Sequence, residues 1–358
     1  MLENPVLTYG LFFIACLAFS LIINNFLLKF AKTLGIRNTS ETIIRWSGTS
    51  KPSLGGISFF IIFLFSLIIV SFLFADDGNF FNLGTLGILL AVTAGFLLGL
   101  FDDAYNTRPL LKFFTQLICG VILIITGTYI QIFDNNFLNY LLTLFWVVGI
   151  MNSINMLDNM DGITTVVSTG ILVAVFLGMF LVAGFENPLI VIVLGTIASL
   201  VGFLYYNWNP SRMFMGDTGS QFLGIILAAF GINCLWNGMS LQTEGPAIMR
   251  FFAVITLFAL PIIDTTTVSI KRILRGSSPF VGGKDHTTHH LSYLGLTDRQ
   301  VAWVFVFLSA VSIILTLFLT SFISTWKMWH NFLYAGYFTV LFAVLFVIAN
   351  MNKEKENI

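Results

Sequence analysis

Polar side chains that could do chemistry are concentrated in residues 152–162, a short stretch between two long apolar segments. It contains Asn155, Asp158 and Asp161, whose three-residue spacing lets them share one face of a helix. Charged residues make up only 9% of the chain, and charged groups close to a bilayer usually have a functional role. We therefore predict that this stretch forms part of a binding or catalytic site.

Two adjacent carboxylates, Asp102 and Asp103, follow the sequence Gly-Leu-Phe at the end of another apolar segment. Such a pair can hold a divalent cation or accept a proton, although a solvated helix end is the simpler alternative. Arg108 and Lys112 follow in the same loop and would suit an anionic ligand. This loop is the second candidate part of the site.

The segment 207–220 supplies a third acidic candidate, Asp217, which stands between Gly216 and Gly219. Glycine lets backbone approach a ligand closely. Mg²⁺ binds few protein carboxylates and completes its shell with water and phosphate oxygens, so Asp217 is a candidate magnesium ligand. The alternative is an N-cap of the next helix. Phe214 could stack on a base, although most of the 39 phenylalanines should pack in the core.

Basic residues complete the set of candidates. Lys51 could pair with a phosphate, or could simply add positive charge to a cytosolic loop. Three of the four histidines, His286, His289 and His290, lie in one long loop and suggest phosphate or sugar recognition. A zinc site is the weaker alternative, because this loop lacks cysteine and a clear fourth ligand. Asp264 is expected to support the site indirectly.

The elements that position these residues are predicted to be membrane-spanning helices. Hydrophobic residues make up 57% of the 358-residue chain, and its charged fraction is far below the roughly 25% of a soluble domain. A spanning helix needs about 20 apolar residues, and backbone groups in lipid must be satisfied within the segment. We predict an all-α polytopic membrane protein with about eleven spans: 5–31, 54–75, 83–101, 113–130, 138–154, 162–183, 188–206, 221–238, 248–270, 301–323 and 331–350.

The distribution of Lys and Arg orients these helices. With the N-terminus outside, all of the 17 basic residues except Arg250 and Lys327 fall on the side of the C-terminus. The positive-inside rule then places the C-terminus in the cytosol. The polar segments all lie on that face, as the catalytic loops of a single membrane domain over residues 1–358: 32–56, 102–112, 152–162, 207–220 and 271–300.

Five motifs, in this order, resemble those of the polyprenyl-phosphate N-acetylhexosamine-1-phosphate transferases of the glycosyl transferase family 4 type. They are Gly55-Gly56, Gly-Leu-Phe-Asp102-Asp103, Asn155-Met-Leu-Asp158-Asn-Met-Asp161-Gly162, Phe214-Met-Gly-Asp217-Thr-Gly-Ser220 and His289-His290-Leu291. The resemblance extends from Lys51 to about Arg299. This superfamily contains phospho-MurNAc-pentapeptide translocase and the WecA/TagO-like UDP-GlcNAc:undecaprenyl-phosphate GlcNAc-1-phosphate transferases.

The resemblance implies a reaction in which undecaprenyl phosphate attacks the β-phosphate of a UDP-N-acetylhexosamine, giving a polyprenyl-diphosphate sugar and UMP. Mg²⁺ is the implied cofactor, with Mn²⁺ as an alternative, and Asp217 is its implied ligand. The implied catalytic acids are Asp102, Asp103 and Asp161. The implied substrate-binding residues are Lys51, Asn155, Asp158, Phe214, His286, His289 and His290.

The same resemblance implies a multi-pass protein of the bacterial cytoplasmic (inner) membrane. It suggests a homodimer and no nucleic-acid partner. The lipid-linked product would begin the synthesis of a cell-envelope glycan, such as the O-antigen of lipopolysaccharide or a teichoic acid.

Within the superfamily, eleven helices and Leu291 after the histidine pair favour the UDP-GlcNAc enzymes, because MurNAc-pentapeptide enzymes have ten helices and three consecutive histidines. The spacing of His286 departs from the usual pattern, because Thr287 stands where the first histidine would fall. Phospho-MurNAc-pentapeptide translocase and a transferase for another UDP-N-acetyl (deoxy)amino sugar therefore stay alternatives. A covalent route through Asp102 or Asp103 also stays open. A secondary transporter is the alternative of a different class, disfavoured because the acids lie at one interface.

Overall fold

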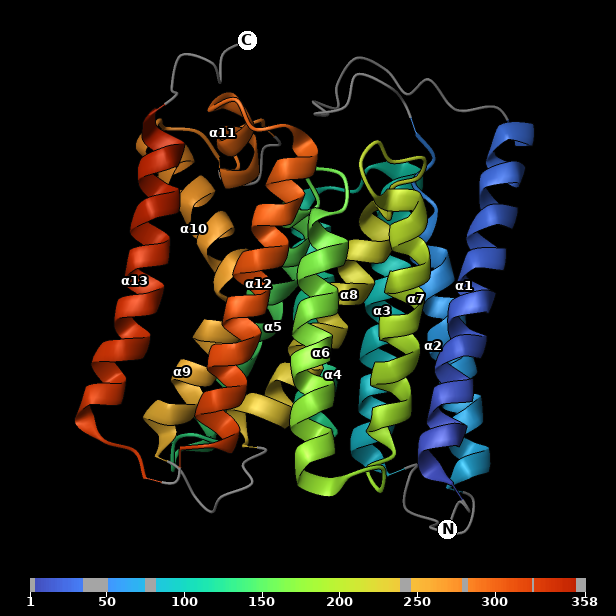
Figure 1. Cartoon of the computed structure of the whole chain (residues 1–358), viewed down its shortest axis with the longest axis horizontal. Helices are drawn as coiled ribbons and strands as arrows, with labels where there is room; N and C mark the ends of the chain where they lie inside the picture. Colours follow the sequence, from blue (N-terminus) through green and yellow to red (C-terminus); the bar gives the residue numbers. More distant parts are fainter. Residues whose placement is uncertain are drawn as a thin grey trace.

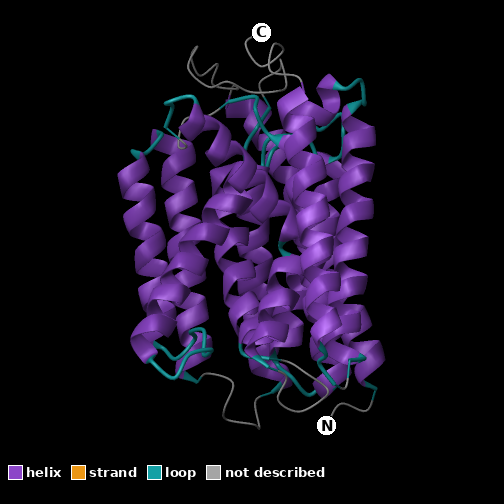
Figure 2. Cartoon of the chain, turned by 90° about the vertical axis from the view of Figure 1, so that its left-hand side faces the viewer, coloured by secondary structure: helices purple, strands orange, loops and turns teal. Residues whose placement is uncertain are grey.

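The computed structural model describes residues 4–34, 51–74, 82–238, 246–278, 283–323 and 325–351. Within these residues the chain forms thirteen α-helices and one π-helical turn, and the only β-type pairing is an isolated bridge between Ser53 and Phe214. The helices run between the two ends of a bundle, with the loops gathered at those ends (Figure 2). The predicted all-α fold is therefore confirmed.

The helices follow the apolar segments of the sequence closely. They are α1 (Pro5–Leu34), α2 (Gly55–Leu73), α3 (Leu83–Tyr105), α4 (Pro109–Ile125), α5 (Asn136–Leu157), α6 (Ile163–Ala183), α7 (Leu189–Asn207), α8 (Gly216–Gly231) with the π-helix η2 (Ile232–Trp236), α9 (Ala247–Leu257), α10 (Ala259–Leu274), α11 (Thr287–Tyr293), α12 (Asp298–Ser321) and α13 (Met328–Met351). Figure 1 shows α1 starting at the lower end of the bundle and α13 finishing at the upper end, beside α11.

In the described part of the chain, nine helical segments are long and apolar enough to cross a membrane, and the bent pair α9–α10 raises this to ten. The protein is thus a polytopic membrane protein, as predicted. The short helix α4 is apolar but only 17 residues long. Eleven spans result only if α4 also crosses, so the number eleven and the orientation stay predictions. The 35–50 part of the predicted loop 32–56 lies outside the described residues.

The predicted helix 248–270 is wrong in one respect, because it is two helices. The axes of α9 and α10 differ by 75° in direction at Phe258. Pro261 has no N–H to donate to the carbonyl of Leu257, four residues earlier, so a straight helix cannot continue through this point. The bend redirects α10 toward the end of the bundle where α11 lies (Figure 1).

Two predicted helix starts also lie too far along the chain. The helix expected at 113–130 is α4, which begins at Pro109 because proline favours the first helical position. It ends at Ile125, shortly before Gly127, which has a φ of 90°. The helix expected at 221–238 begins at Gly216, so the last five residues of the predicted 207–220 loop belong to this helix.

The centre of the bundle is α8, in which every residue from Thr218 to Gly231 is buried. It packs against α2, α3 and α5. The approach is close because a Cβ on Gly99 of α3 would lie 2.2 Å from the Asp217 carbonyl oxygen, and one on Gly56 of α2 would lie 2.2 Å from the Gly219 nitrogen. These two glycines therefore let the start of α8 sit directly against its neighbours.

Candidate active site

Four segments of the chain bring charged and amide side chains to the N-terminus of α8. Asp217 lies in the first turn of this helix, at the same end of the bundle as the last turns of α3 and α5 and the first turn of α4. The Lys112 Nζ of α4 lies 3.3 Å from Asp217 Oδ2, and the Asn155 Nδ2 of α5 donates to Asp217 Oδ1 at 2.7 Å. Asn155 also donates to Ser220 Oγ at 2.8 Å. Segments more than 60 residues apart thus meet at one carboxylate.

Asp102 faces the same lysine from α3. Its side chain is buried, and Oδ1 accepts hydrogen bonds from the Thr107 nitrogen at 2.8 Å and the Thr107 hydroxyl at 2.6 Å. Its Oδ2 forms an ion pair with Lys112. The lysine ammonium therefore lies between two carboxylates, Asp102 and Asp217, whose charges it partly neutralises.

Asp103 has a different role from its neighbour. Its carboxylate accepts hydrogen bonds from the backbone nitrogens of Asp217 at 3.0 Å and Thr218 at 2.9 Å, and from the Thr218 hydroxyl at 2.6 Å. The first N–H groups of a helix have no partner within the helix, so Asp103 caps α8 from outside. Both oxygens are engaged in holding the turn that carries Asp217. Catalysis by Asp103 stays a prediction, whereas its anchoring of α8 is visible.

Lys112 is the functional candidate that sequence reasoning underrated. The sequence placed it in a candidate loop that suits an anion, but did not name it among the catalytic, substrate-binding or metal-binding residues. The usable signal was its position four residues after Arg108 and just past Pro109, which starts a helix. Its partners Asp102 and Asp217 become apparent only in the folded chain.

Asp158 follows α5 as its C-cap and is half-buried. Burial raises the pKa of this carboxyl to about 8, and the negative charges of Asp217 and Asp103 raise it further in the same direction. A carboxyl with this pKa carries a proton at neutral pH until a cation arrives nearby. Asp158 is thus close enough to Asp217 for the charge of Asp217 to change the pKa of Asp158.

A second group of residues lies around Phe214, beside the start of α2. The Phe214 nitrogen donates to the Pro52 oxygen at 2.9 Å, and its carbonyl accepts from the Gly55 nitrogen at 3.1 Å. The Lys51 ammonium lies 5.1 Å from the centre of the Phe214 ring. The bridge between the two predicted segments therefore puts a cation and an aromatic face next to each other.

Asp161 connects this second group to the 152–162 stretch. Its carboxylate accepts from the Ser211 nitrogen at 2.9 Å and the Ser211 hydroxyl at 2.7 Å, and lies 3.5 Å from Lys51 Nζ. Lys51 itself donates to Ser211 Oγ at 2.9 Å. Asn209 adds a longer bond to Asp161 at 3.2 Å. In this structure Asp161 organises the loop before α8, and its predicted catalytic role stays a prediction.

The predicted histidines lie in and just before α11, where they are buried. His286 Nδ1 lies 2.8 Å from Asp264 Oδ2, and Thr287 donates to Asp264 Oδ1 through its nitrogen at 2.8 Å and its hydroxyl at 2.7 Å. Asp264 therefore anchors the start of α11, and its indirect support of the site stays a prediction. Thr287, the residue that departs from the usual motif, takes part in this anchor.

The two remaining histidines also contact protein groups. His290 Nε2 lies 2.8 Å from Lys271 Nζ, and this lysine donates to the Ala349 carbonyl in the last turn of α13 at 2.6 Å. Burial, followed by the charge of His286, lowers the pKa of His289 to about 3, so this imidazole is neutral at pH 7. Substrate contact by these histidines stays a prediction.

The histidine helix is hydrogen-bonded to the 152–162 stretch. The Thr288 hydroxyl donates to Asn159 Oδ1 at 2.5 Å. The five predicted segments are therefore neighbours at one end of the bundle. The 279–282 part of the histidine loop lies outside the described residues.

The donor set at Asp217 fits magnesium better than zinc. Among the residues that the structure describes, no three His, Cys, Asp or Glu side chains are grouped to hold a metal ion, as a structural zinc site requires. The Asp217 side chain is 34% exposed, and Asp102 is the nearby second carboxylate. Mg²⁺ needs few carboxylates and keeps water or phosphate oxygens in its remaining positions, so Asp217 would hold it and Asp102 would lie close by.

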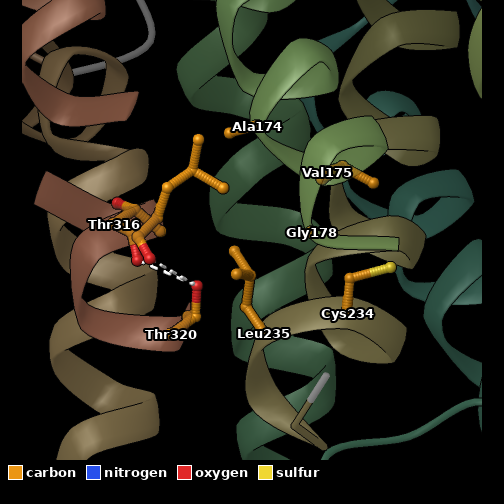
Figure 3. A pocket seen from close by; sticks show the side chains of 8 residues that line it. Ala174, Val175, Gly178, Cys234, Leu235, Thr316 and Thr320 are labelled. Carbon is orange, nitrogen blue, oxygen red and sulfur yellow. Dashed lines mark hydrogen bonds between the residues drawn. The ribbon is translucent and has the colours of Figure 1, made fainter. Parts of the chain in front are cut away.

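A small cavity lies away from these residues, between α6, η2 and α12 (Figure 3). Its lining is mostly apolar and includes Val175, Cys234 and Thr316. Its volume is about 10 Å³, which is close to the minimum for a single water molecule. It is therefore too small for a nucleotide or a lipid headgroup.

Comparison with known proteins gives a consistent result. Residues 85–235, from α3 to η2, match the profile of Glycosyl transferase family 4. A probable undecaprenyl-phosphate N-acetylglucosaminyl 1-phosphate transferase of Bacillus subtilis (strain 168) is 31% identical, over 63% of this chain and 65% of the relative, slightly less than two thirds of its length.

Two other relatives match longer shares of their own length. A decaprenyl-phosphate N-acetylglucosaminephosphotransferase of Mycobacterium leprae (strain TN) is 27% identical over 71% of this chain and 69% of the relative. A phospho-N-acetylmuramoyl-pentapeptide-transferase of Staphylococcus saprophyticus is 31% identical over 72% of this chain and 81% of the relative. All three relatives are named as transferases, and the acceptors or donors in their names differ.

Proposed function

The chain belongs to glycosyl transferase family 4, and we propose that it transfers N-acetylhexosamine 1-phosphate from a UDP-sugar to undecaprenyl phosphate, with release of UMP. The observation that carries this proposal is the meeting of Asp217, Lys112 and Asp102 at the N-terminus of α8. Carboxylates that face a lysine at the end of a membrane bundle suit a diphosphate and its metal ion. The lipid acceptor can reach this end without leaving the bilayer.

Phosphoryl transfer depends mainly on positioning and charge neutralisation. In the proposed reaction an oxygen of the lipid phosphate attacks the β-phosphorus of the UDP-sugar, and the bond from that phosphorus to the bridging oxygen of UMP breaks. Lys112 would neutralise charge on the phosphates, and Asp102 would orient the acceptor phosphate through this lysine. Mg²⁺ held by Asp217 would supply further charge neutralisation. Asp103 and Asn155 would keep Asp217 in place.

The Phe214 group is the proposed nucleoside end of the site. The Phe214 ring offers a face on which uracil could stack, and Lys51 beside it could pair with a phosphate or a base oxygen. Asp161 holds Lys51 and the loop before α8 through Ser211. Asp158 is near enough to Asp217 and Asp161 for their charges to raise its pKa.

We also propose the membrane arrangement that the sequence predicts. The chain would cross the bacterial cytoplasmic membrane eleven times, with α4 and the bent α9–α10 pair each counted once, and the site would face the cytosol. UDP-sugars are made in water, so a cytosolic site at helix ends would meet the nucleotide there and the lipid at the bilayer surface. The suggested homodimer stays a prediction that the mass of the detergent-solubilised protein would test.

UDP-GlcNAc is the proposed donor, and it would make this reaction the first step of a cell-envelope glycan. The Bacillus and Mycobacterium relatives carry N-acetylglucosamine in their names. A UDP-MurNAc-pentapeptide is the second candidate, because the Staphylococcus relative is named for that substrate at the same 31% identity. Leu291 in place of a third consecutive histidine favours the first candidate.

The test is a donor panel. The full chain is purified in detergent with undecaprenyl phosphate and Mg²⁺, and UMP release is measured with UDP-GlcNAc, UDP-GalNAc, UDP-MurNAc-pentapeptide and a UDP-deoxyamino sugar. Asp217→Asn is the blank. Release from UDP-GlcNAc that disappears in the variant supports the proposal. UMP release only from UDP-MurNAc-pentapeptide would show that this donor, and not UDP-GlcNAc, is the substrate. No UMP release with any donor would contradict the transferase assignment and favour a transporter.

A further inference from the structure

Three amide side chains, two of them buried and one partly exposed, lie one helical turn from the Lys112–Asp217 pair, toward the interior of the bundle. Gln116 follows Lys112 by four positions on α4, and Gln221 follows Asp217 by four positions on α8. Asn152 of α5 completes this group, which we call the amide triad. Helices α4 and α8 are therefore joined twice, by the charged pair Lys112–Asp217 and, one helical turn further into the bundle, by the uncharged pair Gln116–Gln221.

The amide triad is hydrogen-bonded within itself. Gln116 Nε2 donates to Gln221 Oε1 at 3.2 Å and lies 3.4 Å from Asn152 Oδ1, while Asn152 Nδ2 donates to Gln116 Oε1 at 2.8 Å. Gln116 and Gln221 are each 1% exposed. Amides in an apolar interior are unfavourable unless they are paired, so three of them at one place indicate a requirement to hold these helices together.

Helix α4 is the element whose position depends most on such hydrogen bonds. It is only 17 residues long, and much of its surface faces outward, with Leu110, Phe114 and Ile125 each more than half exposed. It packs mainly against α3 and α5. Among the described residues, the hydrogen bonds that join α4 to α8 are those of Lys112 with Asp217 and of Gln116 with Gln221.

We propose that the amide triad sets the register of α4 against α8 and so holds the Lys112 ammonium between the Asp102 and Asp217 carboxylates. This inference rests on the proposed transferase function and makes Gln116, Asn152 and Gln221 positioning residues. They touch neither substrate nor metal in the proposed reaction. The hydrogen bonds of the triad run between its own members and to the Val148 carbonyl, and they do not involve the nucleoside end of the site. Loss of the triad should therefore leave binding of the nucleoside end unchanged.

The test compares four versions of the full chain in detergent, with undecaprenyl phosphate and UDP-GlcNAc. Gln116→Met keeps the length of the side chain and removes its hydrogen bonds. The double variant Gln116→Asn with Asn152→Gln moves one methylene across the pair and serves as the rescue. The control is Asn139→Leu, which removes a buried amide at the far end of α5 that accepts from Ile132 and Phe133. The wild type is the reference.

Four quantities are measured: kcat, KM for UDP-GlcNAc, the Mg²⁺ concentration at half-maximal rate, and Tm with and without Mg²⁺. For Gln116→Met we expect kcat to fall about 10- to 100-fold, because a displacement of about 1 Å at reacting groups costs roughly this much. We expect KM to stay within about twofold, since an interaction lost only in the transition state changes kcat. The Mg²⁺ requirement should rise and the Mg²⁺-induced gain in Tm should shrink. The double variant should recover most of kcat.

The control decides between positioning and general stability. Asn139→Leu should lower Tm and leave kcat and the Mg²⁺ requirement as in the wild type. The inference is overturned if Gln116→Met and Asn139→Leu behave alike, with a lower Tm and unchanged kcat and Mg²⁺ requirement. If the wild type itself releases no UMP, the proposed function fails, and the Mg²⁺-induced change in Tm alone decides on the triad. If Mg²⁺ then changes the Tm of the wild type and of Gln116→Met by the same amount, the positioning role of the triad is refuted.

Discussion

The Asn155 side chain of α5 donates a hydrogen bond to Asp217 Oδ1 across a distance of 2.7 Å. The amide therefore orients the carboxylate that begins α8, and it leaves Oδ2 to Lys112 at 3.3 Å. Asn155 is also tied to Ser220 one turn along α8, so its own position is set by two contacts. This relationship links the 152–162 stretch to the proposed magnesium ligand.

Asn155→Ala should reduce UMP release without unfolding the protein. Misplacement of a group of the site by about 1 Å can cost about 100-fold in rate, and Asn155 holds the Asp217 carboxylate in position. The measurement is kcat with UDP-GlcNAc and undecaprenyl phosphate, beside a Tm determination. Asn350→Ala is the matched control, because the Asn350 side chain donates to the Phe346 carbonyl of its own helix. A kcat within about twofold of the wild type would refute the role given to Asn155.

Lys112→Met should abolish most activity, because it leaves the Asp102 and Asp217 carboxylates facing one another with no cation between them. We expect kcat to fall about 100-fold or more. Arg108→Met is the control, since Arg108 is an exposed base in the same loop. Equal effects of both substitutions would show that only the net positive charge of the loop matters.

Gly99→Ala should disturb the start of α8. The new Cβ would lie 2.2 Å from the Asp217 carbonyl oxygen, so α3 and α8 must separate. Overpacking of this kind costs about 1–3 kcal/mol, and Asp217 would shift with its helix. Gly178→Ala is the matched control, because a Cβ there meets no atom within 4 Å. The Tm and the rate of UMP release should both be lower in Gly99→Ala than in the wild type. Both should be unchanged in Gly178→Ala.

Binding of Mg²⁺ at neutral pH should release protons, in part from Asp158. Burial first, and then the Asp217 and Asp103 charges, raise the pKa of Asp158 to about 8, well above the usual value of about 3.9. The carboxyl is therefore mostly protonated below pH 8, and a cation near Asp217 favours its ionised form. The number of protons released per Mg²⁺ bound should decrease as the pH rises above 8.

Titration calorimetry in two buffers of different ionisation enthalpy measures this release. The heat of Mg²⁺ binding should depend on the buffer at pH 7 and depend less on it at pH 9. Asp158→Asn should reduce the dependence at pH 7, while Asp134→Asn, in the loop before α5 and far from the site in the chain, should not. An unchanged dependence in Asp158→Asn would show that its proton is not linked to the metal.

Hydropathy was enough to predict the long helices, because a segment in lipid must satisfy its own backbone and carry apolar side chains. It did not predict the short helix α11, which lies within the predicted 271–300 loop. Two helix boundaries also differ from the prediction. Asp103 caps α8 from another helix and lets it start at Gly216, and Pro261 divides the predicted 248–270 helix at Phe258. The first cause involves residues 114 positions apart and is not visible in a local window of sequence.

The residue types of the candidate site, and the end of the bundle where they gather, could be predicted from the sequence, since motifs and hydropathy both depend on local order along the chain. The contacts of each side chain became known from the folded structure. It gave Asp103 the task of holding α8, placed Lys112 between two carboxylates, and joined His290 to Lys271 inside the protein. These pairs depend on how closely helices approach and how they are rotated, and packing between distant segments sets both.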